Sequence, residues 1–142
     1  MGKGLRGVTV YTDGGARGNP GPAGAGFVIR TDDDGEILYE KGLFLGRATC
    51  NVAEYRGLLA GLDMAAQLGA TEVTVVSDSQ LLVRQMNGQY RVKAPHLQPL
   101  YAEAKHLSKA FEQCTFTHVR RENNTHADRL VNEAIDLRQD VT

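Results

Sequence analysis

The stretch VTVYTDGGARGNPG at residues 8–21 carries a β-branched, apolar segment straight into an aspartate and a glycine-rich turn. Its alternating valines and threonines predict a strand over residues 8–12. Asp13 then falls at the strand end, where rigid scaffold can hold a carboxylate and glycines let a ligand's backbone come close. A plain Asp-Gly turn between two strands accounts for the same residues. Alone, the stretch leaves a metal-binding carboxylate and a simple turn as equal alternatives.

The whole chain has the length and composition of one globular domain. It has 142 residues, 42% hydrophobic and 23% charged, so we expect a single domain over residues 1–142 with its core at about residues 8–137. Cys50 and Cys114 show no metal-ligand spacing, which favours a reducing compartment. The first residues, MGKGLR, lack the apolar segment of a signal peptide, and no apolar run has membrane-spanning length. We therefore expect a soluble, cytoplasmic protein that does not bind membranes.

The charge balance argues against binding of nucleic acid by bulk positive charge. The formal net charge is −1, whereas proteins that bind in that way are strongly basic. The charges are unevenly distributed, because residues 14–31 and 79–102 contain basic side chains but no acid. Local basic surface can therefore lie beside an acidic site, although Arg30 and Arg84 are each explained as ordinary solvated residues.

Hydrophobic periodicity and turn residues predict an α/β fold. The expected elements are strands over residues 8–12, 25–30 and 37–45, a helix between a cap at Thr49 or Asn51 and Gly69, a strand over residues 72–77, a short helix over residues 79–86, a longer helix over about residues 96–113, a strand over residues 115–120 and a closing helix over residues 125–138. Two antiparallel hairpins followed by crossover units give a five-stranded mixed sheet, three strands antiparallel and the rest parallel, with helices on both faces.

Three further acids occupy settings comparable with that of Asp13. Asp78 follows a valine-rich strand, and Glu54 and Asp128 fall near helix starts. Right-handed crossovers can set the strands of Asp13 and Asp78 side by side. Taken singly, Glu54 and Asp128 are explained as charges at helix N-termini and Asp78 as a helix cap. Their joint placement favours one acidic cleft.

Such a cleft requires cations. Four carboxylates repel one another unless positive charge lies between them. Oxygen ligands without a histidine or cysteine cluster favour Mg²⁺ or Mn²⁺ over zinc. Two ions roughly 3.5–4 Å apart can activate a water and stabilise the leaving oxygen in phosphodiester hydrolysis. The sequence therefore predicts two Mg²⁺ or Mn²⁺ ions held by Asp13, Glu54, Asp78 and Asp128.

Four motifs, in this order, resemble those of the type 1 ribonuclease H family. They are TDGGARGNPG at residues 12–21, RATCNVAEY at residues 47–55, SDSQL at residues 77–81 and NNTHADRLVNE at residues 123–133. The resemblance runs from about Val8 to about Leu137. It implies a ribonuclease H-like fold and an endonuclease that hydrolyses the RNA strand of RNA/DNA hybrids by a two-metal-ion mechanism, leaving 5′-phosphate and 3′-hydroxyl ends.

The same resemblance implies roles for individual side chains. The four acids match the metal-binding carboxylates of the family. Asn19, Asn51 and Gln80 match residues that touch the minor groove of the hybrid, where 2′-hydroxyls distinguish RNA from DNA. Arg47 and Thr49 match a pocket for a phosphate of the DNA strand. Turn and cap roles explain Asn19 and Thr49 without any ligand.

The loop before Asp128 departs from the family pattern. Many members carry a flexible-loop histidine there, and residues 117–122 contain none in the matching place. Arg121 is the closest replacement, and an arginine can assist electrostatically but cannot shuttle protons near neutrality. We expect His118 in the strand and His126 toward solvent in the first turn of the closing helix.

A second departure from the family pattern concerns the residues that bind the hybrid outside the acidic cleft. Residues 89–95 lead directly into the next helix, which leaves no room for the basic, tryptophan-bearing protrusion of some bacterial members, and the chain has no Trp. This form is similar to the compact archaeal and actinobacterial branch. Tyr90, Arg91 and Lys93 would then contact the hybrid, with strongly salt-sensitive affinity. Cys50 stands where many members have a hybrid-contacting asparagine.

Two other functions stay open. A non-cleaving nucleic-acid-binding module on the same fold is disfavoured because none of the four acids is missing. A nuclease with another preferred duplex, such as double-stranded RNA, or an exonuclease on a related fold is compatible with the short loop. Nothing in the sequence implies an obligate protein partner, so we expect a monomer.

Overall fold

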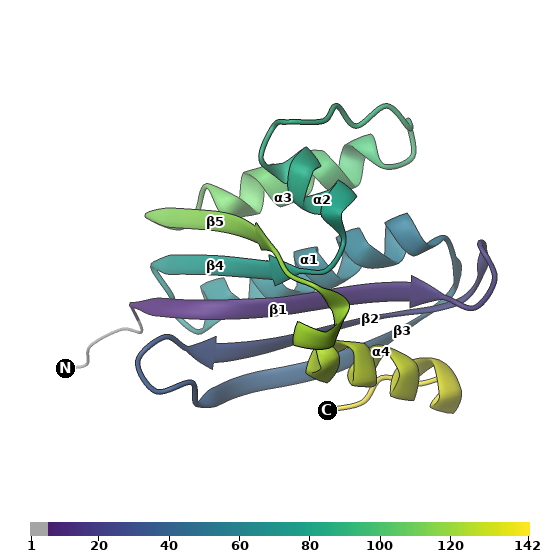
Figure 1. The fold of residues 1–142 in the computed structure, drawn as a ribbon, viewed down its shortest axis with the longest axis horizontal. Coiled ribbons are helices and arrows are strands. Elements are labelled where there is room, and N and C mark those ends of the chain that lie inside the picture. Colours follow the sequence, from purple (N-terminus) through teal and green to yellow (C-terminus); the bar gives the residue numbers. More distant parts are fainter. Residues whose placement is uncertain (1–5) are drawn as a thin grey trace.

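A five-stranded mixed sheet with helices on both faces forms the described part of the chain (Figure 1). The computed structural model describes residues 6–142, so the expectation about a leader falls mostly on residues 1–5, outside the described residues. The strand order is β3-β2-β1-β4-β5, and the predicted fold class is confirmed. The elements are β1 (Gly7–Ala16), β2 (Gly21–Thr31), β3 (Ile37–Ala48), α1 (Cys50–Gln67), β4 (Glu72–Ser77), α2 (Gln80–Met86), α3 (Gln98–Ser108), β5 (Gln113–His118), the 3₁₀ turn η1 (Arg121–Asn123) and α4 (Thr125–Leu137).

Strand pairing brings the ends of β1 and β4 together. β1 pairs antiparallel with β2, and β2 with β3. β4 lies parallel to β1 on its other side, with Thr12 opposite Ser77, and β5 lies parallel to β4. Asp13 directly follows Thr12, and Asp78 directly follows Ser77. Because β1 and β4 run in the same direction, the two aspartates lie at the same end of the two strands. The predicted neighbourhood of these two strands is therefore confirmed.

The apolar core lies between the sheet and the helix pair α1 and α3. α1 packs on β1 and β2, α3 packs on α1, and α4 covers the opposite face over β1, β2 and β3. Alternate residues of β1, Val8 and Val10, are fully buried against Leu58 and Leu62 of α1, as strand and helix periodicities require. None of the helices in residues 6–142 combines the length and hydrophobicity needed to cross a membrane.

The glycine-rich segment after Asp13 is strand, not turn. Gly14, Gly15 and Ala16 continue β1 and pair with Ala25, Gly24 and Ala23 of β2. The expectation that Asp13 ends the strand is therefore wrong. The physical reason is close packing: a Cβ on Gly14 would lie 2.3 Å from the backbone carbon of Ala53 in α1. Glycine here lets the helix approach the strand.

The same close approach recurs from the helix side. A Cβ on Gly57 of α1 would lie 2.6 Å from the carbonyl oxygen of Asp13. The helix begins as predicted at Thr49, whose hydroxyl accepts a hydrogen bond from the Val52 N–H at 3.2 Å. Glu54 lies beyond the first turn. α1 and β1 are thus in backbone contact at the level where their acids project.

Several predicted boundaries are wrong by a few residues. α3 starts at Gln98 instead of His96, with Pro99 in its first turn, and it stops at Ser108 well before Gln113. β5 begins two residues earlier than expected, because its register with β4 pairs Glu72 with Gln113. The segment between α2 and α3 is an irregular loop that continues past residue 95.

The C-terminal segment adds a feature absent from the sequence expectations. Gly42 and Val141 exchange backbone hydrogen bonds of 2.8 and 2.9 Å. The Asp140 carboxylate accepts a further bond from the Phe44 N–H at 2.9 Å. The end of the described chain therefore lies along the outer edge of β3 and covers part of it.

Candidate active site

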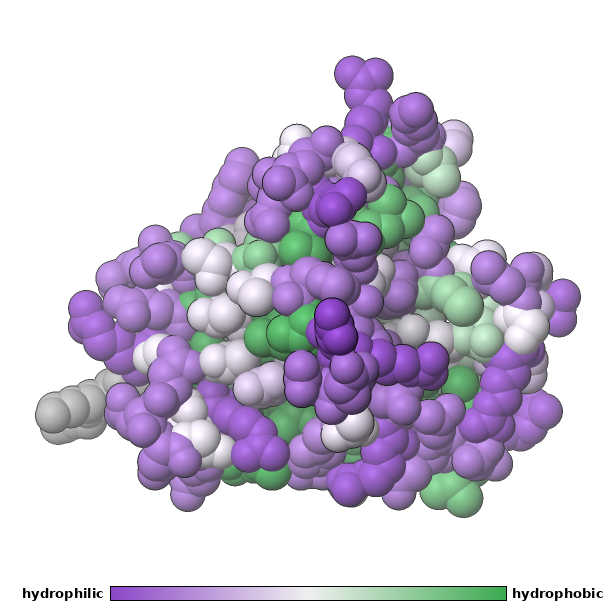
Figure 2. All heavy atoms as spheres, in the orientation of Figure 1, coloured by the Kyte–Doolittle hydropathy of each residue, from purple (hydrophilic) through white to green (hydrophobic). Residues whose placement is uncertain are grey.

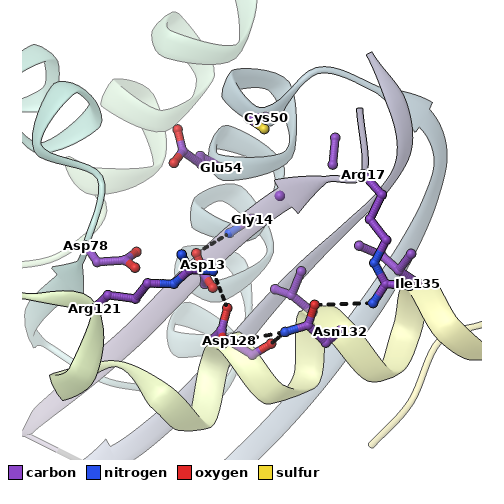
Figure 3. Close-up of a pocket in the computed structure, with 13 residues that line it drawn as sticks. Asp13, Gly14, Arg17, Cys50, Glu54, Asp78, Arg121, Asp128, Asn132 and Ile135 are labelled. Atoms are coloured by element: carbon purple, nitrogen blue, oxygen red, sulfur yellow. Dashed lines mark hydrogen bonds and ion pairs between the residues drawn. The ribbon is translucent and has the colours of Figure 1, made fainter. Parts of the chain in front are cut away.

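One concavity collects the four predicted acids. It has a volume of about 520 Å³ and is bordered by the ends of β1 and β4 and by α1 and α4 (Figure 3). Its lining includes Asp13, Glu54, Asp78, Asp128 and Arg121, together with Arg17, Cys50 and Asn132. Figure 2 shows that the face of the molecule drawn in Figure 1 is covered mostly by hydrophilic residues, with smaller hydrophobic areas between them. A ligand here meets mainly polar groups.

Asp13 lies at the centre of the acidic group. Its Oδ1 accepts a hydrogen bond from the Gly14 N–H at 2.9 Å. Burial, followed by the neighbouring charge of Asp78, raises the pKa of Asp13 from 3.8 to about 8, and Asp128 contributes to the same rise. Without a compensating cation, the fold therefore holds this carboxyl in an environment that disfavours its charged form.

Glu54 is held by the first residue after Asp78. Its Oε1 accepts a hydrogen bond from the Ser79 hydroxyl at 3.1 Å. Burial raises the pKa of Glu54 from 4.5 to about 7, which the Ser79 bond opposes and Asp78 reinforces. The Ser79 hydroxyl also accepts from the Leu82 N–H at 3.2 Å, so Ser79 caps α2. The simpler explanation of Asp78 as that cap is therefore wrong, as is that of Glu54 as a first-turn charge.

Asp128 belongs to the first turn of α4 and faces Arg121. Its Oδ1 lies 3.6 Å from Nη2 of Arg121, whose side chain is 78% exposed. Asn132, one turn further along α4, donates from Nδ2 to the Asp128 carbonyl oxygen at 3.1 Å. In Figure 3 the Arg121 side chain extends between Asp78 and Asp128. Arg121 thus supplies positive charge at the rim of the acidic group.

Asn124 links the strand that carries Asp13 to the helix that carries Asp128, and the sequence did not indicate this role. It occupies the N-cap position of α4 but makes no capping bond with its side chain. Instead its Nδ2 donates to the carbonyl oxygen of Thr12 at 2.8 Å, and the side chain is buried. The bond ties the residue before Asp13 to the start of the helix that carries Asp128. The only sequence signal was an asparagine where a capping residue is expected.

The predicted substrate-binding residues lie around the concavity rather than inside it. Asn19 accepts from the Cys50 N–H at 3.1 Å, which links the loop after β1 to the start of α1. Asn51 and Gln80 are exposed in the first turns of α1 and α2. Thr49 caps α1. Arg47 lines a different, smaller concavity on the β3 side.

Neither His118 nor His126 lines the acidic concavity. His126 approaches Oε1 of Glu40 at 3.2 Å and its side chain is 24% exposed, so the expectation that it faces solvent is wrong. His118 ends β5 and is exposed.

The loop before α3 carries the other residues that we expected to contact the hybrid. The Tyr90 hydroxyl accepts a hydrogen bond from Arg84 at 2.6 Å, and Arg91 and Lys93 are exposed. Cys50 lines the acidic concavity itself.

Comparison with known proteins identifies the family. A family model described as reverse transcriptase-like matches residues 11–134. The crystal structure of RNase H1 from the halophilic archaeon Halobacterium salinarum NRC-1 has a TM-score of 0.88 and is 42% identical, covering 92% of this chain and 98% of that one. The chain belongs to the type 1 ribonuclease H family.

Two further ribonuclease H structures are similar over an equal share of the chain. The N-terminal RNase H domain of Rv2228c from Mycobacterium tuberculosis has a TM-score of 0.90 and 52% identity, covering 92% of this chain and 94% of that one. LC11-RNase H1, solved in complex with RNA/DNA hybrid, has a TM-score of 0.87 and 46% identity, covering 92% and 98%. A curated relative, the bifunctional protein Rv2228c from Mycobacterium tuberculosis, is 53% identical to this chain over 129 aligned residues, which make up 91% of this chain. The chain spans about a third of the length of that curated relative, 35%.

The acids of this ribonuclease H chain fit divalent cations by their chemistry. They offer only carboxylate oxygens, the ligands preferred by Mg²⁺ and Mn²⁺. Burial, and secondly the charge of Asp78, raises the pKa of both Asp13 and Glu54, and a bound cation would favour their ionised forms. Within residues 6–142, however, no three His, Cys, Asp or Glu side chains form a preassembled metal-ligand group.

Proposed function

We propose that this chain is an endonuclease that hydrolyses the RNA strand of RNA/DNA hybrids with two divalent cations. The observation that carries the proposal is the meeting of Asp13, Glu54, Asp78 and Asp128 in one concavity, with Arg121 at its rim. Family membership adds that LC11-RNase H1, 46% identical, was solved with such a hybrid. The proposed products carry 5′-phosphate and 3′-hydroxyl ends.

The four acids would hold the two ions, Mg²⁺ or Mn²⁺. When bound, the ions supply Lewis-acid activation of a water and stabilise charge on the phosphate. Asp13 and Glu54 would bind in their ionised forms, although their surroundings disfavour that form in the metal-free protein. Hydrolysis adds water across the bond between phosphorus and the 3′-oxygen, and the departing oxygen takes a proton.

Arg121 would stabilise negative charge that develops on the phosphate. It lies 3.6 Å from Asp128 and is mostly exposed, so its guanidinium can turn toward a bound backbone. Because arginine stays charged at all working pH values, its contribution would not vary near neutrality. A member with a titrating loop histidine would differ in this respect.

Substrate contacts would come from the residues around the concavity. Asn19 uses its side-chain oxygen on Cys50, which leaves its Nδ2 to donate to a 2′-hydroxyl in the minor groove. Asn51 and Gln80 start the two neighbouring helices and would add contacts of the same kind. Arg47 and Thr49 are proposed to bind the DNA backbone. The enzyme would act as a monomer in the cytoplasm, where its two free cysteines stay reduced.

The test compares duplexes under controlled metal. Labelled RNA/DNA, RNA/RNA and DNA/DNA duplexes are incubated with the protein in EDTA, Mg²⁺ or Mn²⁺, and the product ends are analysed. The proposal expects internal cuts in the RNA of the hybrid, only with metal, with 5′-phosphate ends. Cleavage in EDTA, or 3′-phosphate ends, would contradict the mechanism. If the RNA/RNA duplex were cleaved as fast as the RNA/DNA hybrid, the proposed specificity for hybrids would be wrong and the enzyme would be a nuclease of broader duplex specificity.

A further inference from the structure

A buried polar pair joins α1 to α2. The Tyr55 hydroxyl donates a hydrogen bond to Oε1 of Gln85 at 2.7 Å. Both side chains are buried, with exposed fractions of 1% for Tyr55 and 6% for Gln85. Burying a polar group costs free energy even when the group is paired, and two apolar side chains of similar shape would avoid that cost. The pair therefore calls for an explanation beyond the packing of the core.

Polar burial in this protein adjoins the four acids of the concavity. Besides Tyr55, the buried polar side chains of residues 6–142 are Thr12, Ser77, Gln85 and Asn124. Two of them directly precede Asp13 and Asp78, and Asn124 binds the carbonyl oxygen of Thr12. The remaining one is Gln85, whose partner Tyr55 directly follows Glu54. The Tyr55–Gln85 pair thus belongs with the buried polar groups next to the acid-bearing segments.

The helix α2 is bonded to α1 at both of its ends. At its start, the Ser79 hydroxyl donates to Oε1 of Glu54 at 3.1 Å. Near its end, Gln85 accepts the bond from Tyr55. The two α2 residues are six positions apart, which corresponds to about 9 Å along a helix at 1.5 Å per residue. Two separated contacts fix both the place and the tilt of a short helix, whereas one contact leaves the helix free to pivot.

The length of α2 makes such fixing necessary. It has seven residues, and isolated helices shorter than about 12 residues are marginal in water. Leu82 and Met86 bury apolar surface in the core, but apolar contact is non-directional. A hydrogen bond requires a defined distance and angle. The Tyr55–Gln85 bond can therefore specify where α2 lies on α1.

We propose that the Tyr55–Gln85 hydrogen bond is a positioning contact of the active site: it fixes the end of α2 on α1 and thereby keeps the Ser79 hydroxyl within reach of Glu54. Tyr55 and Gln85 are positioning residues, because neither lines the acidic concavity. Ser79 orients the Glu54 carboxylate, and the same helix carries Gln80, which is proposed to contact the hybrid. The proposal rests on the proposed function, since the orientation of Glu54 affects hydrolysis only if Glu54 holds a catalytic ion.

Tyr55→Phe removes the hydroxyl and keeps the ring. We expect the melting temperature to fall, because Oε1 of Gln85 is left buried without a partner. In the folded variant, kcat on a labelled hybrid should fall roughly three- to tenfold through displacement of Ser79 from Glu54. KM should change less than about twofold, since most of the proposed substrate contacts lie outside α2. Ile29→Val, which trims a fully buried residue of β2, is the control: it should lower the melting temperature and leave kcat unchanged.

The decisive variant combines Tyr55→Phe with Gln85→Met, because it separates position from stability. Both partners are then apolar and no buried polar atom of the pair is left over, so the melting temperature should return toward that of wild type. The directional bond is still absent, and we expect kcat to remain three- to tenfold low. A purely structural role predicts that kcat recovers. All variants are assayed where they are fully folded, so kcat decides between the two roles at any melting temperature.

Hydrogen exchange in EDTA gives a readout that needs neither metal nor cleavage. The Leu82 N–H donates to Oγ of Ser79 at 3.2 Å, and the Val83 N–H donates to the Ser79 carbonyl oxygen at 3.1 Å. If α2 is free to pivot in the double variant, both amides should exchange at least about threefold faster than in wild type. The amide of Ala104 in α3 serves as the internal control and should not change.

Either of two results would overturn the proposal: wild-type kcat in the folded double variant, or unchanged exchange at Leu82 and Val83. Failure of the proposed function has a different signature. In that case wild type cleaves no hybrid in any metal, whereas faster exchange in α2 of the double variant still shows that the Tyr55–Gln85 bond positions the helix.

Discussion

The two sides of α1 contain opposite kinds of contact. Toward the sheet, Leu58 and Leu62 lie fully buried in the apolar cluster that includes Val8, Val10 and Phe27. At its N-terminal end, Glu54 shares a concavity with three more acids, and its pKa is raised to about 7. The apolar side lowers the free energy of the folded chain. The acidic end raises the free energy of the folded chain as long as no cation is bound there. One part of the helix therefore contributes to stability, and another part is suited to metal binding.

Asp78→Asn breaks the acidic side most directly. We expect kcat on an RNA/DNA hybrid to fall roughly 10³-fold or more, because one oxygen ligand of the proposed metal pair is lost. Folding is retained, and in EDTA the melting temperature stays the same or rises, since a like charge beside Asp13 is removed. The measurement is hydrolysis of a labelled hybrid with circular dichroism on the same sample. Asp33→Asn, an exposed acid of the β2–β3 hairpin, is the matched control; near-normal turnover in Asp78→Asn would refute the site.

Leu62→Ala breaks the apolar side instead. Leu62 is fully buried, so the truncation should lower the free energy of unfolding by about 2–5 kcal/mol. The expected signature is a lower denaturation midpoint with an unchanged slope, and normal kcat at a temperature where the variant is folded. Leu137→Ala, at a residue 58% exposed, should change stability by less than about 0.5 kcal/mol. A large loss of kcat in fully folded Leu62→Ala would show that the two sides are not separate.

Asn124→Ala tests the link between the acids. The substitution removes the stabilising hydrogen bond to the Thr12 carbonyl oxygen. It also removes the buried Asn124 Oδ1, which has no hydrogen-bond partner within residues 6–142 and is therefore destabilising. These opposing effects limit the stability cost to about 1 kcal/mol. Displacement of Asp128 relative to Asp13 should lower kcat roughly tenfold, with little effect on KM. Asn123→Ala, the exposed neighbour, serves as control, and an unchanged kcat in Asn124→Ala would remove the positioning role.

The smallest expected effect is the pH dependence of the metal-free protein. The pKa of Asp13 is 3.8 in an unfolded chain and about 8 in the fold, so the folded state retains a proton that the unfolded state has released. Stability therefore falls as pH rises from about 4 through about 8, by about 1 kcal/mol after allowance for solvent screening. Asp13→Asn in EDTA should show a shallower slope in parallel denaturation series, retaining only the part that the raised pKa of Glu54 contributes. Wild-type stability that rises over the same interval, relative to Asp13→Asn, would contradict the raised pKa.

Local patterns were sufficient to predict the elements and their order. Alternation in β1 and the spacing of Leu58, Leu59 and Leu62 predicted the strand and helix that form the core. Crossover handedness then predicted that β1 and β4 are neighbours. These features depend on short-range periodicity and on general topology, so one sequence is enough to find them.

Long-range contacts account for what the sequence did not predict. Gly14 and Gly15 suggest a turn locally, whereas both continue β1, and Gly14 does so in close contact with the backbone of α1. The bond of Asn124 to Thr12 joins residues 112 positions apart. The pairing of Val141 with Gly42 likewise depends on where α4 ends in space. No local pattern encodes such distances.

The backbone contact between β1 and α1 has a consequence for how this protein can change. Because a Cβ on Gly57 would meet the Asp13 carbonyl at 2.6 Å, main-chain atoms fix the separation between the strand that bears Asp13 and the helix that bears Glu54. Side chains deeper in the core can then be exchanged, by drift or by design, without moving these two acids. A single added methyl at Gly57 would alter their spacing more than several conservative exchanges of larger residues. We therefore expect the spacing of Asp13 and Glu54 to vary little when residues of the core are exchanged.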